Sequence, residues 1–456
     1  MKNNKFLLIS YAYPPKDVVG ALRPYRISKY LPALGWVPEV ITAKLPKKSK
    51  SSKASKLNIL DSVITHKTHD FDPLSVFKSN RLKRKKKAPE RRDAFLMNES
   101  QSEELTYRKA APERLVDRFK GCLIGLISTP DRQIFWGISL LLCGIYVLSR
   151  RPSKFRLIMT TSPPHSNQVF GCLLAKIIKK PHVVDLRDPW TDVYRGYKSK
   201  FRTYLENRLE KWVIENSACV ISCTEAYTKL LQSRFYGLPK SRFQTVTNSF
   251  EEEKFESISE AKSKRFTLAY LGIFYPRRNP YCFFQALGLW LQRHAEYVDN
   301  VEFRIIGKCD PVTRAMISRY NLEKVVHVTG RLAHEEAIAM TKSADLLLLL
   351  TGTGFDTPKG WVPSKLYEYM ACGKPILANI PEGQASEIIK KTRSGFLVYK
   401  NDSDAIMEIL DQEYLRKTER KSKKNLTPFV QDRNEVFKYG NKYCTRRFVE
   451  IFESIV

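Results

Sequence analysis

Short, continuously apolar segments alternate with helical patterns along the second half of this sequence. Each apolar segment has the length of a strand, and each helical pattern repeats its apolar residues three and four positions apart. Strands that are apolar throughout must be buried on both faces, as in a parallel sheet covered by helices on each side. The predicted strands occupy residues 266–272, 303–307, 326–330, 344–351, 375–380 and 396–399. We therefore predict an α/β domain with a doubly wound parallel sheet.

The first half of the chain repeats this alternation, with predicted strands at 5–10, 37–43, 155–161, 182–188 and 218–223. A chain of 456 residues is too long for one ordinary domain. We therefore predict two doubly wound domains that face a central cleft, a fold suited to a substrate that contains a nucleotide. The predicted boundaries are 1–247 and 248–428, followed by a helical segment at 429–456.

An insertion of about residues 44–132 interrupts the first domain and carries much positive charge. Residues 77–92 contain nine basic residues and one acidic residue, and the whole chain has a formal charge of +31. Such an excess indicates a polyanionic partner, which is nucleic acid, an anionic membrane or a phosphorylated substrate. The charge is accompanied by no nucleic-acid recognition motif, so we expect no nucleic acid and an anionic membrane surface instead. Residues 114–127 could lie in the membrane interface.

Several other functions are excluded or disfavoured by what the sequence lacks. No G-x-G-x-x-G follows the first strand and no Walker A motif is present, which argues against dinucleotide and P-loop enzymes. Nine scattered cysteines, without a C-x-x-C pair, indicate a reducing compartment. The pairs Asp70–Asp72 and Asp402–Asp404 have no further carboxylates nearby, so we expect no metal.

Two apolar segments bear on membrane attachment. The N-terminal apolar run has four residues before Pro14, which is too short for a signal peptide. The longest run, at 134–148, has fifteen residues and falls short of the ~20 that span a bilayer. It is therefore predicted to be either a buried helix or a helix that rests on a membrane.

The segment WVPSKLYEYMACGKP, residues 361–375, places charge at the start of a mostly apolar helix. Ser364 marks the helix start, and Lys365 next to it is electrostatically unfavourable unless an anion is shared there. A diphosphate suits such a helix N-terminus, and Glu368, about one turn later, could accept from ribose hydroxyls. The alternative is a solvated Lys365 that pairs with Glu368 on the surface.

Two strand ends add candidates for the same cleft. Gly272 ends a predicted strand and is followed by Arg278, whose guanidinium could bind phosphate oxygens; a basic surface loop is the alternative. After the first strand, Gly20 could let the backbone approach a diphosphate. Arg23 could contact the diphosphate from the other side of the cleft.

Further polar residues follow other predicted strands. His165 could orient or deprotonate a reacting group, or simply cap or pack a helix. Asp188, within DLRDPW, could touch an acceptor, or could belong to a structural cluster with Asp185 and Arg187. The remaining candidates, which could face a donor sugar or a diphosphate, are Glu382, Gly383 and Gln384.

These motifs together resemble a bacterial glycosyltransferase of the family 4, group 1 type. The resemblance rests on YAYPP with VGALRPYR, TTSPPHS, VDLRDPW, YLGIFYPRRNP and VPSKLYEYMACGKP, and is strongest over 266–398. It implies the GT-B fold of two Rossmann-like domains, an acceptor side at 1–247 and a nucleotide-sugar side at 248–428. It also implies that the last helix crosses back to the first domain.

The resemblance assigns roles to individual positions. Arg278 matches a diphosphate-contacting lysine, Glu368 matches the later of two spaced glutamates on the ribose, and His165 is similar to a histidine of the catalytic loop. Two positions depart from the family pattern. Ile273 stands where an arginine is expected, and Gly360 stands where the earlier glutamate should hold the donor sugar.

The sequence thus predicts a retaining transfer from a nucleotide sugar, with UDP favoured over GDP, to a polysaccharide or lipid-linked acceptor in bacterial surface glycan synthesis. The transferred group would be a hexose or an N-acetylhexosamine. His165, Arg278 and Lys365 are the predicted catalytic residues, with no metal and no other cofactor. We expect a cytoplasmic protein attached to the inner face of the membrane. The alternatives are a GT-B-type epimerase and a non-catalytic, electrostatically membrane-bound partner of a glycan-assembly complex.

Overall fold

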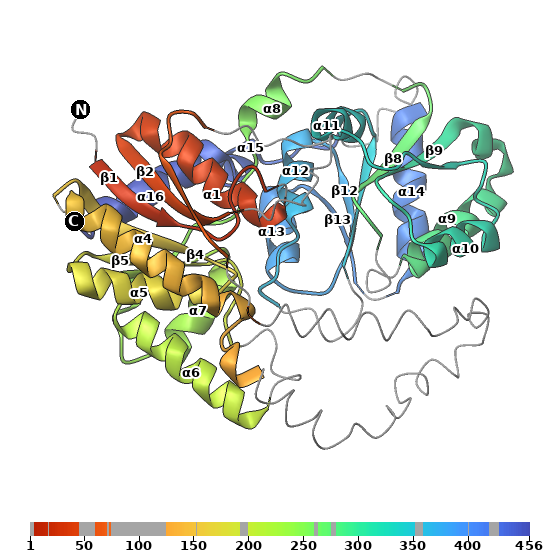
Figure 1. Cartoon of the computed structure of the whole chain (residues 1–456). Coiled ribbons are helices and arrows are strands. Elements are labelled where there is room, and N and C mark those ends of the chain that lie inside the picture. Colours follow the sequence, from red (N-terminus) through yellow and green to blue (C-terminus); the bar gives the residue numbers. More distant parts are fainter. Residues whose placement is uncertain are drawn as a thin grey trace.

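Two α/β units, each built on a parallel sheet, lie side by side in the computed structural model (Figure 1). The prediction of two Rossmann-like doubly wound units is confirmed. The structure describes residues 4–16, 18–44, 60–70, 73, 125–151, 153–191, 199–259, 263–274, 280–351, 359–399, 401–418 and 428–456.

The first sheet has seven parallel strands in the order β3-β2-β1-β4-β5-β6-β7. The strand order reverses direction between β1 and β4, and such a switch point opens a crevice at the carboxyl ends of the strands. Its strands are β1 (Asn4–Ile9), β2 (Trp36–Ala43), β3 (Thr65–Thr68), β4 (Phe155–Ser162), β5 (His182–Leu186), β6 (Cys219–Ser222) and β7 (Phe243–Thr245). The helices of this unit are α1 (Val19–Tyr30), η1 (Leu31–Leu34), η4 (Arg132–Phe135), α4 (Trp136–Arg150), α5 (Ser166–Ile178), α6 (Lys200–Glu215), α7 (Glu225–Arg234) and η6 (Lys240–Arg242).

Strand β3 lies within the range that the sequence assigned to an insertion. It pairs in parallel with β2, and the Trp136 indole donates a hydrogen bond to Thr68 Oγ1 at 2.7 Å. The strand has the sequence THKT, which lacks the apolar run used to find the predicted strands. The basic run at 77–92 lies outside the described residues, as do residues 114–124 of the proposed interfacial segment.

The second sheet has six parallel strands in the order β10-β9-β8-β11-β12-β13, with its switch point between β8 and β11. Its strands are β8 (Phe266–Leu271), β9 (Val301–Ile306), β10 (Val326–Val328), β11 (Leu346–Leu350), β12 (Ile376–Asn379) and β13 (Gly395–Val398). Its helices are α8 (Glu252–Glu256), α9 (Tyr281–Arg293), η7 (Ala295–Asn300), α10 (Pro311–Arg319), α11 (His334–Lys342), α12 (Ser364–Cys372), α13 (Gln384–Thr392) and α14 (Ser403–Thr418).

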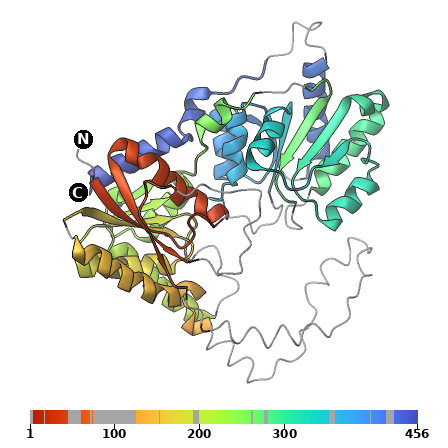
Figure 2. The same cartoon turned by 45° about the horizontal axis from the view of Figure 1, so that its top comes forward.

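The C-terminal helices return to the first unit (Figures 1 and 2). After α15 (Arg433–Phe437), helix α16 (Asn441–Glu453) lies against α1 and η1. The Phe452 ring lies 5.2 Å from Phe6 and 5.0 Å from Trp36, centroid to centroid, inside the core of the first unit. The chain therefore crosses between the units twice, once near residue 250 and once near residue 440.

Candidate active site

A cavity of about 620 Å³ lies between the two units and is lined from both sides. The first unit contributes the start of α1 and the segments after β4, β5 and β6, and the second contributes the end of β8 and the start of α12. Because parallel strands present their carboxyl ends at one edge, the cavity lies where the switch points of both sheets meet. We call it the interdomain cavity.

Helix α12 is held at the switch point of the second sheet by Tyr369. Its hydroxyl accepts a hydrogen bond from the Leu271 N–H at 2.8 Å and donates one to the Leu348 carbonyl at 3.2 Å. The buried phenol thus joins the ends of β8 and β11, which are paired only nearer their starts. This tie aims the N-terminus of α12 into the interdomain cavity.

Lys365 and Gly272 meet at this helix N-terminus. The Lys365 ammonium lies 3.8 Å from the centre of the Tyr270 ring, a cation–π contact, and lines the interdomain cavity together with Glu368. A Cβ atom at Gly272 would lie 2.9 Å from Lys365 Nζ. Gly272 also has φ +116°, which an L side chain rarely adopts, so the backbone requires glycine there, and a side chain would push the Lys365 ammonium aside.

The N-terminus of α12 carries no acidic residue in its first turn and no side-chain cap, because Pro363 occupies the cap position. Ser364 is therefore the first helical residue. The helix dipole and the Lys365 ammonium together favour an anion at this end of the cavity. Arg278, the other predicted phosphate contact, lies outside the described residues.

Arg23 is an internal tie, which corrects its predicted role in diphosphate binding. Its guanidinium makes a bidentate pair with the buried Asp185, the closest contact being 2.8 Å, and donates to the carbonyls of Val246 and Thr247, each at 2.8 Å. Four of its five N–H groups are thereby used. Arg23 joins the first helix to the end of the first unit and lines the cavity without presenting a free cation to it.

Within the DLRDPW segment, Arg187 has a structural role and Asp188 lines the interdomain cavity. Arg187 donates to the carbonyls of Ser162 at 2.6 Å, Gly20 at 2.7 Å and Pro163 at 3.0 Å, so it fixes the loop that carries Gly20. Asp188 lines the interdomain cavity, as Gly20 does. Burial raises the pKa of Asp188, and the Arg187 charge opposes that rise only in part.

His165 occupies the cap position of α5 and stacks on Trp190, with ring centroids 4.9 Å apart and planes 5° apart. It is absent from the described residues that line the interdomain cavity. The structure therefore places this predicted catalytic residue against Trp190, outside the described lining of the interdomain cavity. Its catalytic role stays a prediction.

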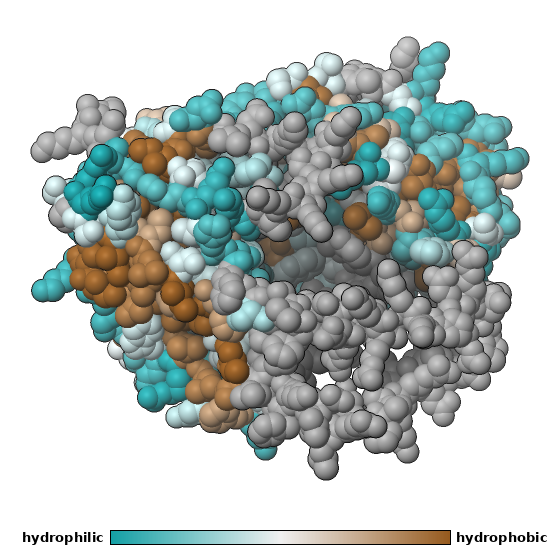
Figure 3. Space-filling model, viewed as in Figure 1, coloured by the Kyte–Doolittle hydropathy of each residue, from teal (hydrophilic) through white to brown (hydrophobic). Residues whose placement is uncertain are grey.

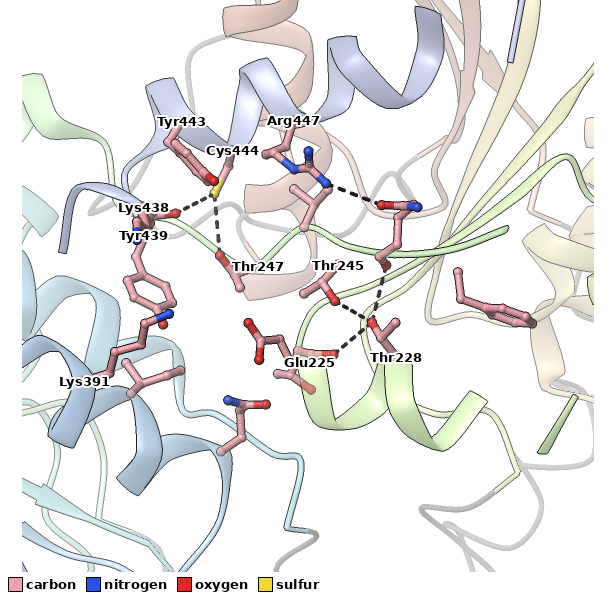
Figure 4. A pocket seen from close by; sticks show the side chains of 16 residues that line it. Glu225, Thr228, Thr245, Thr247, Lys391, Lys438, Tyr439, Tyr443, Cys444 and Arg447 are labelled. Carbon is pink, nitrogen blue, oxygen red and sulfur yellow. Dashed lines mark hydrogen bonds between the residues drawn. The ribbon is translucent and has the colours of Figure 1, made fainter. Parts of the chain in front are cut away.

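Glu382, Gly383 and Gln384 do not line the interdomain cavity among the described residues. Glu382 is exposed, and a Cβ atom at Gly383 would lie 2.5 Å from the Lys359 carbonyl oxygen. Gln384 instead joins the two units, because its Oε1 accepts a hydrogen bond from the Ala226 N–H at 2.8 Å. It lines a second cavity of about 450 Å³ between α7, α13 and α16, which we call the α7–α13 cavity (Figure 4).

Tyr227 is a residue of the interdomain cavity that the sequence reasoning missed. A Cβ atom at Gly360 would lie 2.3 Å from Tyr227 Cε1, so the Tyr227 ring fills the space above Gly360. The side chain is 4% exposed, and its hydroxyl has no hydrogen-bond partner among the described residues. Burial raises the pKa of Tyr227, which keeps the phenol neutral. Tyr227 could have been predicted as a cleft residue from the sequence, because it lies at the start of a helix that follows the strand β6.

This fold and site define a class of protein. Residues 251–427 match the family model described as glycosyl transferases group 1. The second unit therefore carries a group 1 glycosyltransferase domain, which supports a transferase activity for the chain.

Two curated relatives are named as glycosyltransferases. An uncharacterized glycosyltransferase of Methanocaldococcus jannaschii is 22% identical over 316 residues, which are 66% of this chain and 76% of that protein. WcaL of Escherichia coli, whose name assigns it to colanic acid biosynthesis as a glycosyltransferase, is 35% identical over 105 residues. That match spans 23% of this chain and only 26% of WcaL.

Solved structures show the same fold over the whole chain. HepE of Anabaena, in complex with UDP, has a TM-score of 0.61 at 13% identity and covers 99% of this chain and 100% of its own. Sucrose-phosphate synthase of Thermosynechococcus elongatus has a TM-score of 0.60 at 14% identity and covers 99% and 98%. At these identities the likeness concerns the fold.

Proposed function

We propose that this enzyme transfers a hexose or N-acetylhexosamine from a UDP-sugar, with retention at the anomeric carbon, to a polysaccharide or lipid-linked acceptor in surface glycan synthesis. The observation that carries the proposal is the N-terminus of α12, where Lys365 and Gly272 present an anion site to the interdomain cavity. The UDP and UDP-glucose complexes of the similarly folded HepE support the choice of nucleotide. The name of WcaL supports the glycan role.

Each side of the cavity has a proposed task. Transfer breaks the bond between the anomeric carbon and the diphosphate, so negative charge develops on the leaving diphosphate. Lys365 and the α12 N–H groups would stabilise that charge, and Glu368 would accept from the ribose hydroxyls. The acceptor oxygen would form the new bond to the anomeric carbon and pass its proton to the leaving diphosphate. Asp188, which lines the cavity from the first unit, would bind the acceptor hydroxyl. The proposed chemistry uses no metal.

A donor assay with matched variants tests this proposal. Purified enzyme is incubated with a panel of UDP- and GDP-sugars, and released nucleotide is measured with and without acceptor. We expect turnover with a UDP-sugar, and Lys365→Ala should reduce kcat/KM by ~10²–10³-fold, as for the loss of one donor to a developing anion. Lys324→Ala, an exposed lysine of the same unit, is the control and should keep wild-type activity.

Two results would count against the proposal. One is the absence of hydrolysis or transfer with every donor, together with no protection of the fold by UDP. The other is conversion of the sugar without release of nucleotide, which would indicate an epimerase.

A further inference from the structure

Helix α4 presents an apolar stripe to solvent. Its inner face is buried on the first sheet through Trp136, Leu140 and Leu148. The outward side chains of Ile138, Leu142 and Tyr146 are 59%, 65% and 56% exposed, and their spacing of four residues aligns them along one side of the helix. We call these three residues the α4 stripe. Figure 3 shows the apolar surface gathered over this part of the first unit.

The chain segment that contains the α4 stripe carries positive charge only. Between Asp131 and Asp185 the sequence has eight Lys or Arg residues and no Asp or Glu. Arg150 and Arg151 are exposed at the end of α4, and the Arg150 guanidinium lies 4.3 Å from the centre of the Tyr146 ring. An apolar stripe with an aromatic residue and arginines at its end matches the interface of an anionic bilayer.

A transmembrane role fits the packing less well. Within the described residues, Arg132–Ser149 is long and apolar enough to cross a membrane by length and composition. However, α4 contacts β2, β3 and α5, so one side of it is a layer of the first unit.

We propose that the α4 stripe rests in the interface of an anionic membrane and docks the enzyme there. This inference rests on the proposed function, which places the acceptor at a membrane. Asp131, next to the start of η4, accepts a hydrogen bond from the N-terminal N–H of α5 at Ser166, at 3.0 Å. One end of the docking helix therefore reaches the cleft side of the first sheet, where a lipid-linked acceptor would enter.

Vesicle sedimentation of the full chain tests the α4 stripe. The probes are vesicles of phosphatidylglycerol with phosphatidylcholine, and vesicles of phosphatidylcholine alone. Leu142→Glu with Tyr146→Glu should reduce partitioning onto the anionic vesicles at least tenfold. Arg150→Glu with Arg151→Glu should reduce partitioning onto anionic vesicles and change partitioning onto neutral ones little. Val430→Glu, a residue 68% exposed in the segment before α15, is the matched control and should bind as the wild type does.

Reduced vesicle binding could also result from misfolding, so a variant that is expected to bind more strongly is included. Leu142→Trp should increase partitioning, since tryptophan favours the interface. Release of nucleotide from a UDP-sugar, measured without vesicles, should be unchanged in Leu142→Glu with Tyr146→Glu. The sedimentation result therefore stands whether or not the donor proposal survives.

Three outcomes would overturn the inference. The first is wild-type sedimentation of Leu142→Glu with Tyr146→Glu. The second is binding that disappears on deletion of residues 78–92 while the stripe variant still binds. The third is a soluble dimer in the wild type that the same stripe variant converts to monomer, which would make the stripe a contact between copies.

Discussion

Tyr227, which lines the interdomain cavity, occupies the space where a side chain at position 360 would lie. The family pattern places a glutamate at position 360, but the Tyr227 ring occupies the space that any side chain there would need. The buried Tyr227 hydroxyl lacks a partner among the described residues, so a ligand hydroxyl is a suitable partner. Where the family pattern has a glutamate, this chain therefore has Gly360, and the Tyr227 side chain of the first unit lies beside it.

Because Gly360 and Tyr227 are in contact, we predict that substitutions at the two positions have non-additive effects on the free energy of unfolding. Gly360→Ala should lower the free energy of unfolding by ~1–3 kcal/mol through overpacking against the ring. In the Tyr227→Leu background the same substitution should cost less, because the clashing ring atoms are removed. Urea unfolding of the four proteins measures the coupling. Equal costs in both backgrounds would contradict the packing described here.

We predict that substitution of Gly272 lowers both the stability of the fold and the activity. Gly272→Ala should cost ~1–3 kcal/mol because φ is +116° there, and should displace Lys365, whose Nζ is 2.9 Å from the new Cβ atom. Activity should therefore fall beyond the loss explained by unfolding. Gly237→Ala, with nothing within 4 Å and no positive φ, is the control. Wild-type kcat/KM in folded Gly272→Ala would disprove the contact.

At the scale of elements, ion pairs hold α1 against the end of the first unit and the first crossing between the units. Arg23 joins α1 to Asp185 in β5 and to the carbonyls of Val246 and Thr247. Glu251 in the crossing segment contacts Arg26, Lys29 and Lys254 at 3.4, 2.9 and 2.9 Å. These pairs tie α1 to the segment that leads into the second unit.

Arg23 can be tested as a structural tie against its predicted role as a phosphate contact. Arg23→Leu should destabilise the fold by ~3–5 kcal/mol, because Asp185 is left buried and unpaired. UDP affinity of the folded fraction should change less than about threefold, since a ligand receives little from this guanidinium. Thermal unfolding and UDP titration measure the two effects. A tenfold loss of UDP affinity with unchanged stability would restore the phosphate role.

Glu251 predicts a loss of stability in acid. Burial alone would raise the pKa of Glu251, but the hydrogen bond from Lys254 and the charges of Arg26 and Lys29 outweigh it and lower the pKa from 4.5 to about 2. A lowered pKa stabilises the fold above pH ~4.5, and this contribution disappears as the pH falls toward 2. Glu251→Gln should flatten that part of the stability curve by ~1–3 kcal/mol. Unchanged acid sensitivity would contradict this account.

At the scale of the whole molecule, the alternation of apolar strands and helices was sufficient to predict the two sheets, because buried parallel strands must be apolar. Two strands of the first sheet were not predicted: β3, because THKT contains no apolar residue, and β7, because FQT is only three residues long. Arg23 was misjudged because its partner, Asp185, lies 162 residues away. Gln384 was misplaced because its hydrogen bond to Ala226 depends on how the two units meet, which no local pattern encodes.

The central claim is that the interdomain cavity is the donor site, and a crystal structure with bound UDP tests it most directly. The account predicts diphosphate oxygens within hydrogen-bond distance of Lys365 Nζ and the first N–H groups of α12, with the ribose at Glu368. UDP bound instead in the α7–α13 cavity beside Gln384, with the α12 N-terminus free of ligand, would contradict it.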